Sequence, residues 1–334
     1  MTDALVFLTA ALVALLLGKP MVGWLASIRA RQTIYAYAPE THRAKEGTPT
    51  MGGLLIMLGV VVGLVVWAAT TRESTRESLI PVLVIFAGAA WFALIGLLDD
   101  YWIRRWTGQR GLEWKQKLAL QLVAGSVSIY VLWLAASGVA EPFLGGADAG
   151  RAQLPLTPAT FALGVFWLVS WVNAFNLTDG LDGLAAGLTA LAMLGVYAIS
   201  AGQGSWVAYA LMVAGGCVGY LWWNVYPARV FMGDTGSMFL GASFGLLTLR
   251  SLLDVPALRH WGAFAVVGLV FAVEILSVVV QLSSVKLRGG KRIFRATPIH
   301  HHFELLGWAE PTIVMRFWLA GAMAAAGGVA ISRW

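Results

Sequence analysis

The chain has 334 residues, of which 59% are hydrophobic and only 12% are charged. Charged residues make up about a quarter of a typical soluble domain, so this composition excludes a disordered chain, a nucleic-acid-binding module and an ordinary soluble enzyme. Glycine (38 residues) and tryptophan (16 residues) are abundant, as in membrane helices, where glycine allows close packing and tryptophan lies at the interface. The sequence therefore predicts a polytopic membrane protein.

Ten apolar stretches are candidates for membrane-spanning helices, since one span takes about 20 apolar residues. In chain order they cover residues 4–25, 51–70, 79–98, 116–137, 159–176, 184–201, 205–223, 236–250, 261–283 and 311–331. The first begins near Asp3 rather than with a basic segment, which favours a retained helix over a cleaved signal peptide. We therefore expect an all-α fold of about ten transmembrane helices, forming one integral-membrane domain over residues 1–334.

The distribution of basic residues predicts the orientation of these helices. The net charge is +6, and 16 of the 23 Lys and Arg residues lie in or at the edge of the loops that follow odd-numbered stretches. Six lie in the other loops and at the C-terminal end, and Arg316 lies inside the tenth stretch. Because Lys and Arg concentrate in cytoplasmic loops, we expect the odd-numbered loops in the cytoplasm and both termini outside.

Side chains able to bind metals or transfer protons gather in four of the loops expected on the cytoplasmic face. They are Asp99, Asp100, Asp179, Asp182, Asp234 and the triplet His300, His301 and His302. Convergence of such groups from separate loops on one membrane face predicts an active site there.

Asp99 and Asp100 end the third stretch, where the helix dipole disfavours carboxylates and where adjacent carboxylates repel each other. Two sources of positive charge could offset this repulsion. Arg104 and Arg105 could supply positive charge, or a hard cation such as Mg²⁺, which prefers oxygen ligands, could lie between the acids.

The second acidic pair has a structural alternative. Asp179 or Asp182 could cap the helix that begins near Leu184, or the flanking glycines could let the backbone approach a ligand closely. Asp234 lies between glycines at the start of a helix, a plausible cradle for phosphate or metal.

The triple histidine is unusual in a core or a membrane span. Zinc ligation lacks support, because neither a cysteine nor a helical i,i+4 histidine pair accompanies it. Phosphate binding or proton transfer fits better. Glu274, inside the ninth stretch, is either functional or paired with a Ser, a Trp or Arg316 on another helix.

Five segments in this order resemble the phospho-N-acetylmuramoyl-pentapeptide transferase family, within the polyprenyl-phosphate N-acetylhexosamine-1-phosphate transferase superfamily. They are Lys45-Glu46-Gly47-Thr48-Pro49-Thr50-Met51-Gly52-Gly53, Asp99-Asp100-Tyr101, residues 176–183, residues 231–236 and Pro298-Ile299-His300-His301-His302-Phe303-Glu304. The first and last of these segments distinguish the family from related sugar-phosphate transferases.

The resemblance implies ten transmembrane helices, a homodimer in the bacterial cytoplasmic (inner) membrane and a cytoplasmic active site that needs Mg²⁺. The implied reaction transfers phospho-MurNAc-pentapeptide from its UDP carrier to undecaprenyl phosphate. The products are lipid I and UMP, in the first membrane step of peptidoglycan synthesis.

The resemblance also assigns roles to residues. The catalytic and metal group would be Asp99, Asp100, Asp234 and His300, with Asp234 and Asp100 as metal ligands. Phe231 would stack on uracil, and Leu181, Asp182 and Asn224 would surround the base. The remaining substrate-binding residues would be Lys45, Thr50, Lys117, Asn176, Asp179, Gly233, His301 and His302.

One position departs from the family pattern. Members usually carry Lys two positions after the tyrosine of Asp99-Asp100-Tyr101, and this chain has Ile103, followed by Arg104 and Arg105. We hypothesise that one of these arginines replaces the missing cation.

Two other functions compete with this interpretation. A related transferase acting on UDP-GlcNAc would share the chemistry with a smaller donor. A secondary transporter would place its site near the membrane midplane, often between inverted repeats, whereas these acids lie in loops on one face and the sequence shows no repeat.

Overall fold

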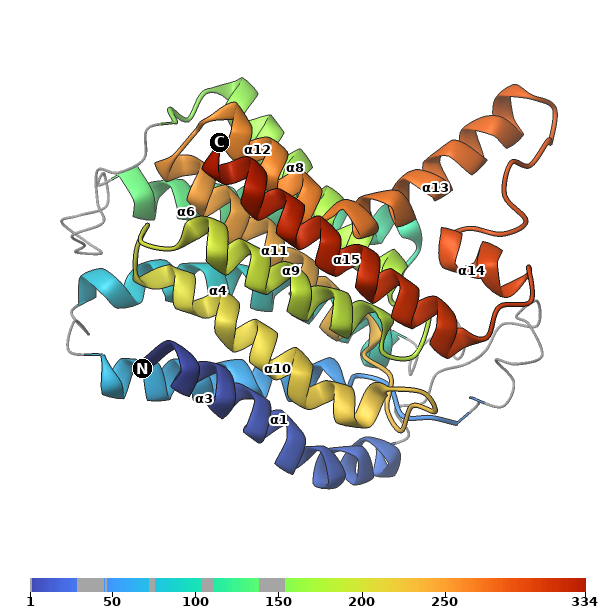
Figure 1. Cartoon of the computed structure of the whole chain (residues 1–334), viewed down its shortest axis with the longest axis horizontal. Coiled ribbons are helices and arrows are strands. Elements are labelled where there is room, and N and C mark those ends of the chain that lie inside the picture. The colour runs from blue at the N-terminus through green and yellow to red at the C-terminus, as the bar shows by residue number, and fades with distance from the viewer. Residues whose placement is uncertain (1, 29–44, 46, 72–75, 104–110, 138–153) are drawn as a thin grey trace.

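The computed structural model describes residues 2–28, 45, 47–71, 76–103, 111–137 and 154–334. Every regular element within these ranges is a helix (Figure 1). In chain order the elements are α1 (Thr2–Ser27), α3 (Gly53–Thr70), α4 (Arg76–Leu97), the π-helix η1 (Leu98–Ile103), α6 (Trp114–Ser137), α8 (Pro158–Thr178), α9 (Leu184–Ser200), the 3₁₀ helix η2 (Ser205–Val207), α10 (Ala208–Asn224), α11 (Gly233–Asp254), α12 (Leu258–Val267), α13 (Leu269–Leu287), α14 (Ile299–Glu304) and α15 (Glu310–Arg333).

The helices confirm a polytopic membrane protein. In the described part of the chain, nine helical stretches are long and apolar enough to span a membrane. All ten predicted stretches are helical, but α9 has only 17 residues and falls short of that length. The ninth stretch is also divided, because the helix is interrupted at Gly268 between α12 and α13.

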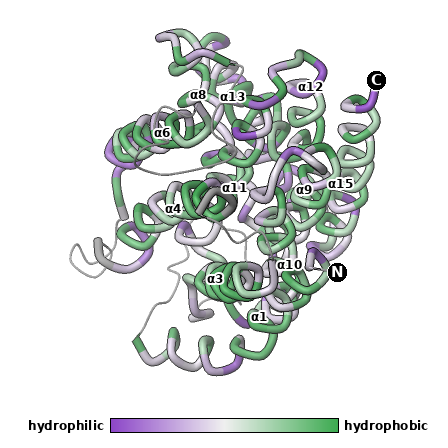
Figure 2. The backbone as a smooth tube through the Cα atoms, turned by 90° about the vertical axis from the view of Figure 1, so that its left-hand side faces the viewer, coloured by the Kyte–Doolittle hydropathy of each residue, from purple (hydrophilic) through white to green (hydrophobic). Residues whose placement is uncertain are grey.

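Helix α11 forms the centre of the bundle. The whole of its most apolar 18-residue window is buried, and it packs against α3, α4 and α8, as the end-on view shows (Figure 2). Glycines allow this packing: a Cβ atom on Gly53 would lie 2.1 Å from the Cα of Gly236, and one on Gly241 would lie 2.7 Å from the Cα of Val172. Backbones in such close contact are typical of membrane helices, whose interfaces favour small residues.

The outer surface of the bundle is apolar, and the two ends differ. Large hydrophobic side chains such as Leu16, Phe166 and Met323 are exposed, as expected for helices that face lipid. Both termini lie at one end of the bundle, while α14 and the connection between α10 and α11 lie at the other (Figure 1). The predicted acids and histidines belong to this second end.

Replacing Gly241 by alanine is expected to destabilise the protein, because the added methyl group meets the backbone of α8, which cannot move aside without shifting the whole helix. Overpacking of this kind costs about 1–3 kcal/mol. Gly262→Ala is the matched control, since a Cβ atom at this other helical glycine has nothing within 4 Å. Thermal unfolding in detergent would show a lower midpoint for the first variant only; equal midpoints would contradict the packing account.

Candidate active site

Asp99 and Asp100 are buried at the end of α4, in the first turn of the π-helix η1. They lie at the C-terminal end of the third span, as predicted, although the α-helix itself ends at Leu97 and η1 continues the chain as a wider helical turn. π-Helical turns occur frequently at functional sites. One oxygen of Asp99 accepts a hydrogen bond from the backbone N–H of Leu112.

Lys117 supplies positive charge beside Asp99 and Asp234. Its ammonium lies 3.2 Å from Asp99 Oδ2 and also contacts Asp234 Oδ2. Asn176 Nδ2 donates to the other oxygen of Asp234, at 2.8 Å. The arginines expected to compensate these acids, Arg104 and Arg105, lie outside the described residues.

Asp100 is held against the start of α11. Its Oδ2 accepts hydrogen bonds from both the backbone N–H and the hydroxyl of Thr235, each at 2.9 Å. Gly233 has a positive φ of 73°, and a Cβ atom there would lie 2.5 Å from Asp100 Oδ2 and 2.7 Å from Thr50 Oγ1. Only glycine fits this position without strain, which explains why Asp234 follows a glycine.

The segment that precedes α3 is fixed to the loop that precedes α11. The N–H of Phe231 donates to the Pro49 carbonyl, and the N–H of Gly52 donates to the Phe231 carbonyl, both at 2.8 Å. Between these bonds Met51 has a φ of 72°, a conformation that residues other than glycine rarely adopt. The two pairings bring Thr50 and Phe231 to the acids on α11.

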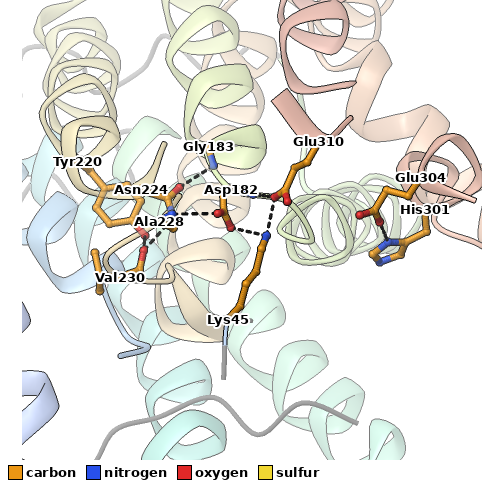
Figure 3. Close-up of polar contacts among 10 residues, drawn as sticks. All are labelled: Lys45, Asp182, Gly183, Tyr220, Asn224, Ala228, Val230, His301, Glu304 and Glu310. Atoms are coloured by element: carbon orange, nitrogen blue, oxygen red, sulfur yellow. Dashed lines mark hydrogen bonds and ion pairs between the residues drawn. The ribbon is translucent and has the colours of Figure 1, made fainter. Parts of the chain in front are cut away.

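A second polar cluster contains Lys45, Asp182, Asn224 and Glu310 (Figure 3). The Lys45 ammonium lies 2.7 Å from Asp182 Oδ1 and 2.6 Å from Glu310 Oε1. Asp182 Oδ2 accepts the N–H of Ala228 at 2.9 Å. Asn224 accepts the N–H of Gly183 at 3.0 Å through its side-chain oxygen. These bonds link the α8–α9 loop to the α10–α11 loop.

Burial and charge oppose each other at Lys45. Burial lowers the pKa of the ammonium, but the hydrogen bonds and negative charges of Asp182 and Glu310 more than offset burial and raise the pKa above its ordinary value. Lys45 therefore stays charged throughout the physiological range.

Neither aspartate of the α8–α9 loop caps α9. The N-cap residue of α9 is Gly183, which provides no side-chain hydrogen bond, and Asp182 instead bonds Lys45 and Ala228. Asp179 is half-buried, and its pKa is raised to about 8, first by burial and then by the charges of Asp234, Asp100 and Asp182. The capping alternative is excluded, and the loop belongs to the acidic cluster. Leu181 is buried within it.

The three histidines have different environments. His300 is fully buried, and its Nδ1 lies 3.1 Å from Glu274 Oε2. His301 Nδ1 lies 2.5 Å from Glu304 Oε2, and His302 Nδ1 accepts the N–H of Arg295 at 3.1 Å. Of the three, His300 also reaches the acidic loop, because a Cβ atom on Gly180 would lie 2.2 Å from its Nε2.

Two acids have partners that the sequence does not reveal, Glu274 and Glu310. The partner of Glu274 is His300 rather than Ser, Trp or Arg316; the Arg316 guanidinium instead lies 4.1 Å from the centre of the Trp308 ring. Glu310 stands in the sequence only as an acid in the first turn of a helix, a common position. Its contact with Lys45 crosses 265 residues, and no local pattern signals it.

The arrangement suits chemistry on anions with a divalent cation. Asp99, Asp100 and Asp234 supply more negative charge than Lys117 balances, and Asp179 beside them has its pKa raised to about 8, first by burial and then by the charges of neighbouring aspartates. In the portions that the structure describes, no group of three His, Cys, Asp or Glu side chains is arranged to hold a metal ion by itself. Magnesium at phosphoryl-transfer sites typically uses one or two carboxylates together with water and substrate phosphates.

Comparison with known proteins gives two matches to family models. The model described as Glycosyl transferase family 4 matches residues 82–252, and Phospho-N-acetylmuramoyl-pentapeptide-transferase signature 1 matches residues 45–57. The first range carries the acids of η1, of the α8–α9 loop and of the start of α11, and the second carries Lys45 and Thr50. A membrane-helix bundle with this match and these buried acids defines a membrane-embedded transferase.

Three curated relatives carry the name phospho-N-acetylmuramoyl-pentapeptide-transferase. The protein of Moorella thermoacetica is 41% identical over 95% of this chain and 95% of its own length. That of Heliobacterium modesticaldum is 40% identical over 98% and 96%, and that of Francisella tularensis subsp. holarctica is 37% identical over 94% and 88%. The chain belongs to the phospho-N-acetylmuramoyl-pentapeptide-transferase family.

Replacing Asp179 by asparagine is expected to change the pH dependence of stability. The pKa of Asp179 is about 8 in the folded protein and about 3.9 in an unfolded chain, so the folded state binds more protons between these values. Wild-type stability contributed by this group therefore falls as pH rises through that window, and the variant lacks this fall.

Thermal unfolding midpoints in detergent with EDTA, measured for both proteins at about pH 5 and about pH 9, on either side of the folded pKa, would test the prediction. The unfolding midpoint of the variant, relative to that of the wild type, should be higher at the higher pH than at the lower pH. Parallel pH profiles would show that Asp179 does not titrate as its surroundings imply.

Proposed function

We propose that this protein transfers phospho-MurNAc-pentapeptide from UDP-MurNAc-pentapeptide to undecaprenyl phosphate, giving lipid I and UMP in peptidoglycan synthesis. The observation that carries the proposal is one cluster of acids within the region matched by the transferase family. Lys117 contacts Asp99 and Asp234, and Asp100 is bonded to Thr235, the residue after Asp234. The names of the relatives supply the donor, and the apolar surface of the bundle suits an acceptor that enters from lipid.

The reaction joins two anions, so the site must reduce the repulsion between them. Lys117 and Lys45 provide positive charge in partly buried positions, where it acts more strongly than in water. Phosphoryl transfer depends mainly on positioning and on charge stabilisation, and both clusters supply these.

Magnesium is the proposed cofactor, with Asp234 and Asp100 as its ligands. The donor atoms fit, since they are carboxylate oxygens next to Asp179, whose pKa is raised to about 8 by burial and by neighbouring negative charge. When bound, the cation would neutralise oxygens of the diphosphate. Asp234 also contacts Lys117 and Asn176, so these two side chains would adjust around the metal.

Direct attack is our preferred mechanism. An oxygen of the lipid phosphate attacks the β-phosphorus of the donor, a new P–O bond forms, and the bond to UMP breaks. The second pKa of a phosphate monoester is about 6, so the acceptor is largely ionised at neutral pH. Asp99, which contacts Lys117 and the N–H of Leu112, would orient the acceptor or remove its remaining proton.

The location and assembly follow from the charge pattern and from the family resemblance. We place the protein in the bacterial cytoplasmic membrane with the acidic end facing the cytoplasm, where Lys and Arg concentrate. A homodimer is the proposed assembly.

UMP release from UDP-MurNAc-pentapeptide by the purified protein is expected to need both undecaprenyl phosphate and Mg²⁺. Asp234→Asn should lower the rate at least about a hundredfold, because it removes charge from the reacting centre, while Asp3→Asn at the opposite end should retain the wild-type rate. UMP release from UDP-GlcNAc instead would assign the protein to the related transferases that act on this donor. No UMP release with either donor would refute the proposal.

Labelled UMP should not enter the donor when undecaprenyl phosphate is absent. Direct attack forms no intermediate without the acceptor, whereas a phospho-sugar carried on an aspartate would return to UMP and exchange the label. Rapid exchange without acceptor would replace the preferred mechanism by the covalent one.

A further inference from the structure

Glu310 joins three separate segments through one oxygen atom. Its Oε1 lies 2.6 Å from Lys45 Nζ and accepts the backbone N–H of Asp182 at 2.7 Å. Glu310 itself is the first residue of α15. The C-terminal helix is thereby tied to the family signature segment and to the α8–α9 loop (Figure 3).

A purely local role does not account for this geometry. An acid in the first turn of a helix is stabilised by the helix dipole and by nearby N–H groups of its own helix. The N-cap of α15 has no side-chain hydrogen bond, and the bonds recorded for the Glu310 carboxylate go to Lys45 and Asp182 instead. The carboxylate is also largely buried, with a side-chain exposure of 10%.

The contacts restrict what Lys45 can do. An ammonium has three N–H donors, and Asp182 and Glu310 each accept one of them. Among the described residues these two carboxylates are its hydrogen-bond acceptors, so one donor remains for a ligand. A lysine side chain is long and flexible, so acceptors on two sides are needed to keep that donor in one direction.

We propose that Glu310 is a positioning residue of the donor site, which holds the Lys45 ammonium and the Asp182 backbone in the arrangement that binds the diphosphate sugar nucleotide. The inference rests on the proposed function, since it takes that donor as the ligand. Glu310 acts through Lys45 and needs no contact with the substrate.

Glu310→Gln tests this role. The amide oxygen can still accept the Asp182 N–H, but the charge that holds Lys45 is lost, and charge-assisted hydrogen bonds are about twice as strong as neutral ones. We expect the Kd for UDP-MurNAc-pentapeptide to rise about tenfold. Turnover at saturating donor should stay within about twofold of wild type, because the acids around Lys117 are untouched.

A double-mutant cycle shows whether the effect passes through Lys45. Lys45→Met should weaken donor binding, and adding Glu310→Gln to it should weaken binding no further, since the group that Glu310 holds is gone. Asp3→Asn is the matched control: it removes an acid bonded to Tyr197 at the other end of the bundle and should leave the Kd unchanged.

Several results would overturn the inference. An unchanged Kd for Glu310→Gln would do so, as would tighter binding, which would mean that Glu310 mainly repels the anionic donor. Additive effects in the cycle, or a fall in turnover together with the thermal unfolding midpoint, would also refute a positioning role.

Equilibrium binding separates this inference from the proposed function. Wild-type protein that binds the donor but transfers nothing to undecaprenyl phosphate would refute the function and leave the Glu310 measurement valid. Wild-type protein that does not bind the donor would refute both.

Discussion

The concentration of carboxylates at one end of an apolar bundle is the constraint on which the site depends. Like charges so close together repel, and partial burial removes the water that would otherwise screen them. Lys117 contacts Asp99 and Asp234, and Thr235 satisfies Asp100 with two hydrogen bonds. Burial, together with the charges of Asp234, Asp100 and Asp182, raises the pKa of Asp179 to about 8. Such a site favours ligands that carry positive charge. It also favours reactions in which one bound anion is replaced by another.

Precise backbone contacts make this concentration of charge feasible. The central helix α11 approaches its neighbours through glycines, so the acid at its start lies in a rigid frame rather than on a free loop. The pairing of Phe231 with Pro49 and Gly52 holds the neighbouring segment, even though Met51 must adopt a strained φ of 72°. Backbone strain of this kind persists only where the surrounding structure enforces it, and it is common at functional sites.

Much of the fold and part of the site could be predicted from the sequence. Apolar stretches about 20 residues long identify spans because lipid forces the backbone to satisfy its own hydrogen bonds. The acids were likewise recognisable, because charge near a membrane helix is costly and therefore conspicuous. The interruption at Gly268 was not predicted, since a single glycine within an apolar run leaves the hydropathy unchanged. Local sequence also left open that Asp179 or Asp182 caps a helix. In the structure Lys45 and Ala228, distant in the chain, bond the oxygens of Asp182.

The pair of Glu274 and His300 shows how a side chain far from the loops can define the site. Both residues are fully buried, and the carboxylate at Nδ1 fixes the orientation of the imidazole, as carboxylates hydrogen-bonded to a histidine ring do in metal sites. Nε2 then faces the α8–α9 loop, where Gly180 leaves the room that any side chain would fill. Within the described part of the chain Nε2 has no hydrogen-bond partner. An oriented nitrogen beside the acidic loop is suited to proton transfer or to binding a phosphate oxygen. Glu274, which lies inside α13, therefore holds the His300 ring with Nε2 toward that loop.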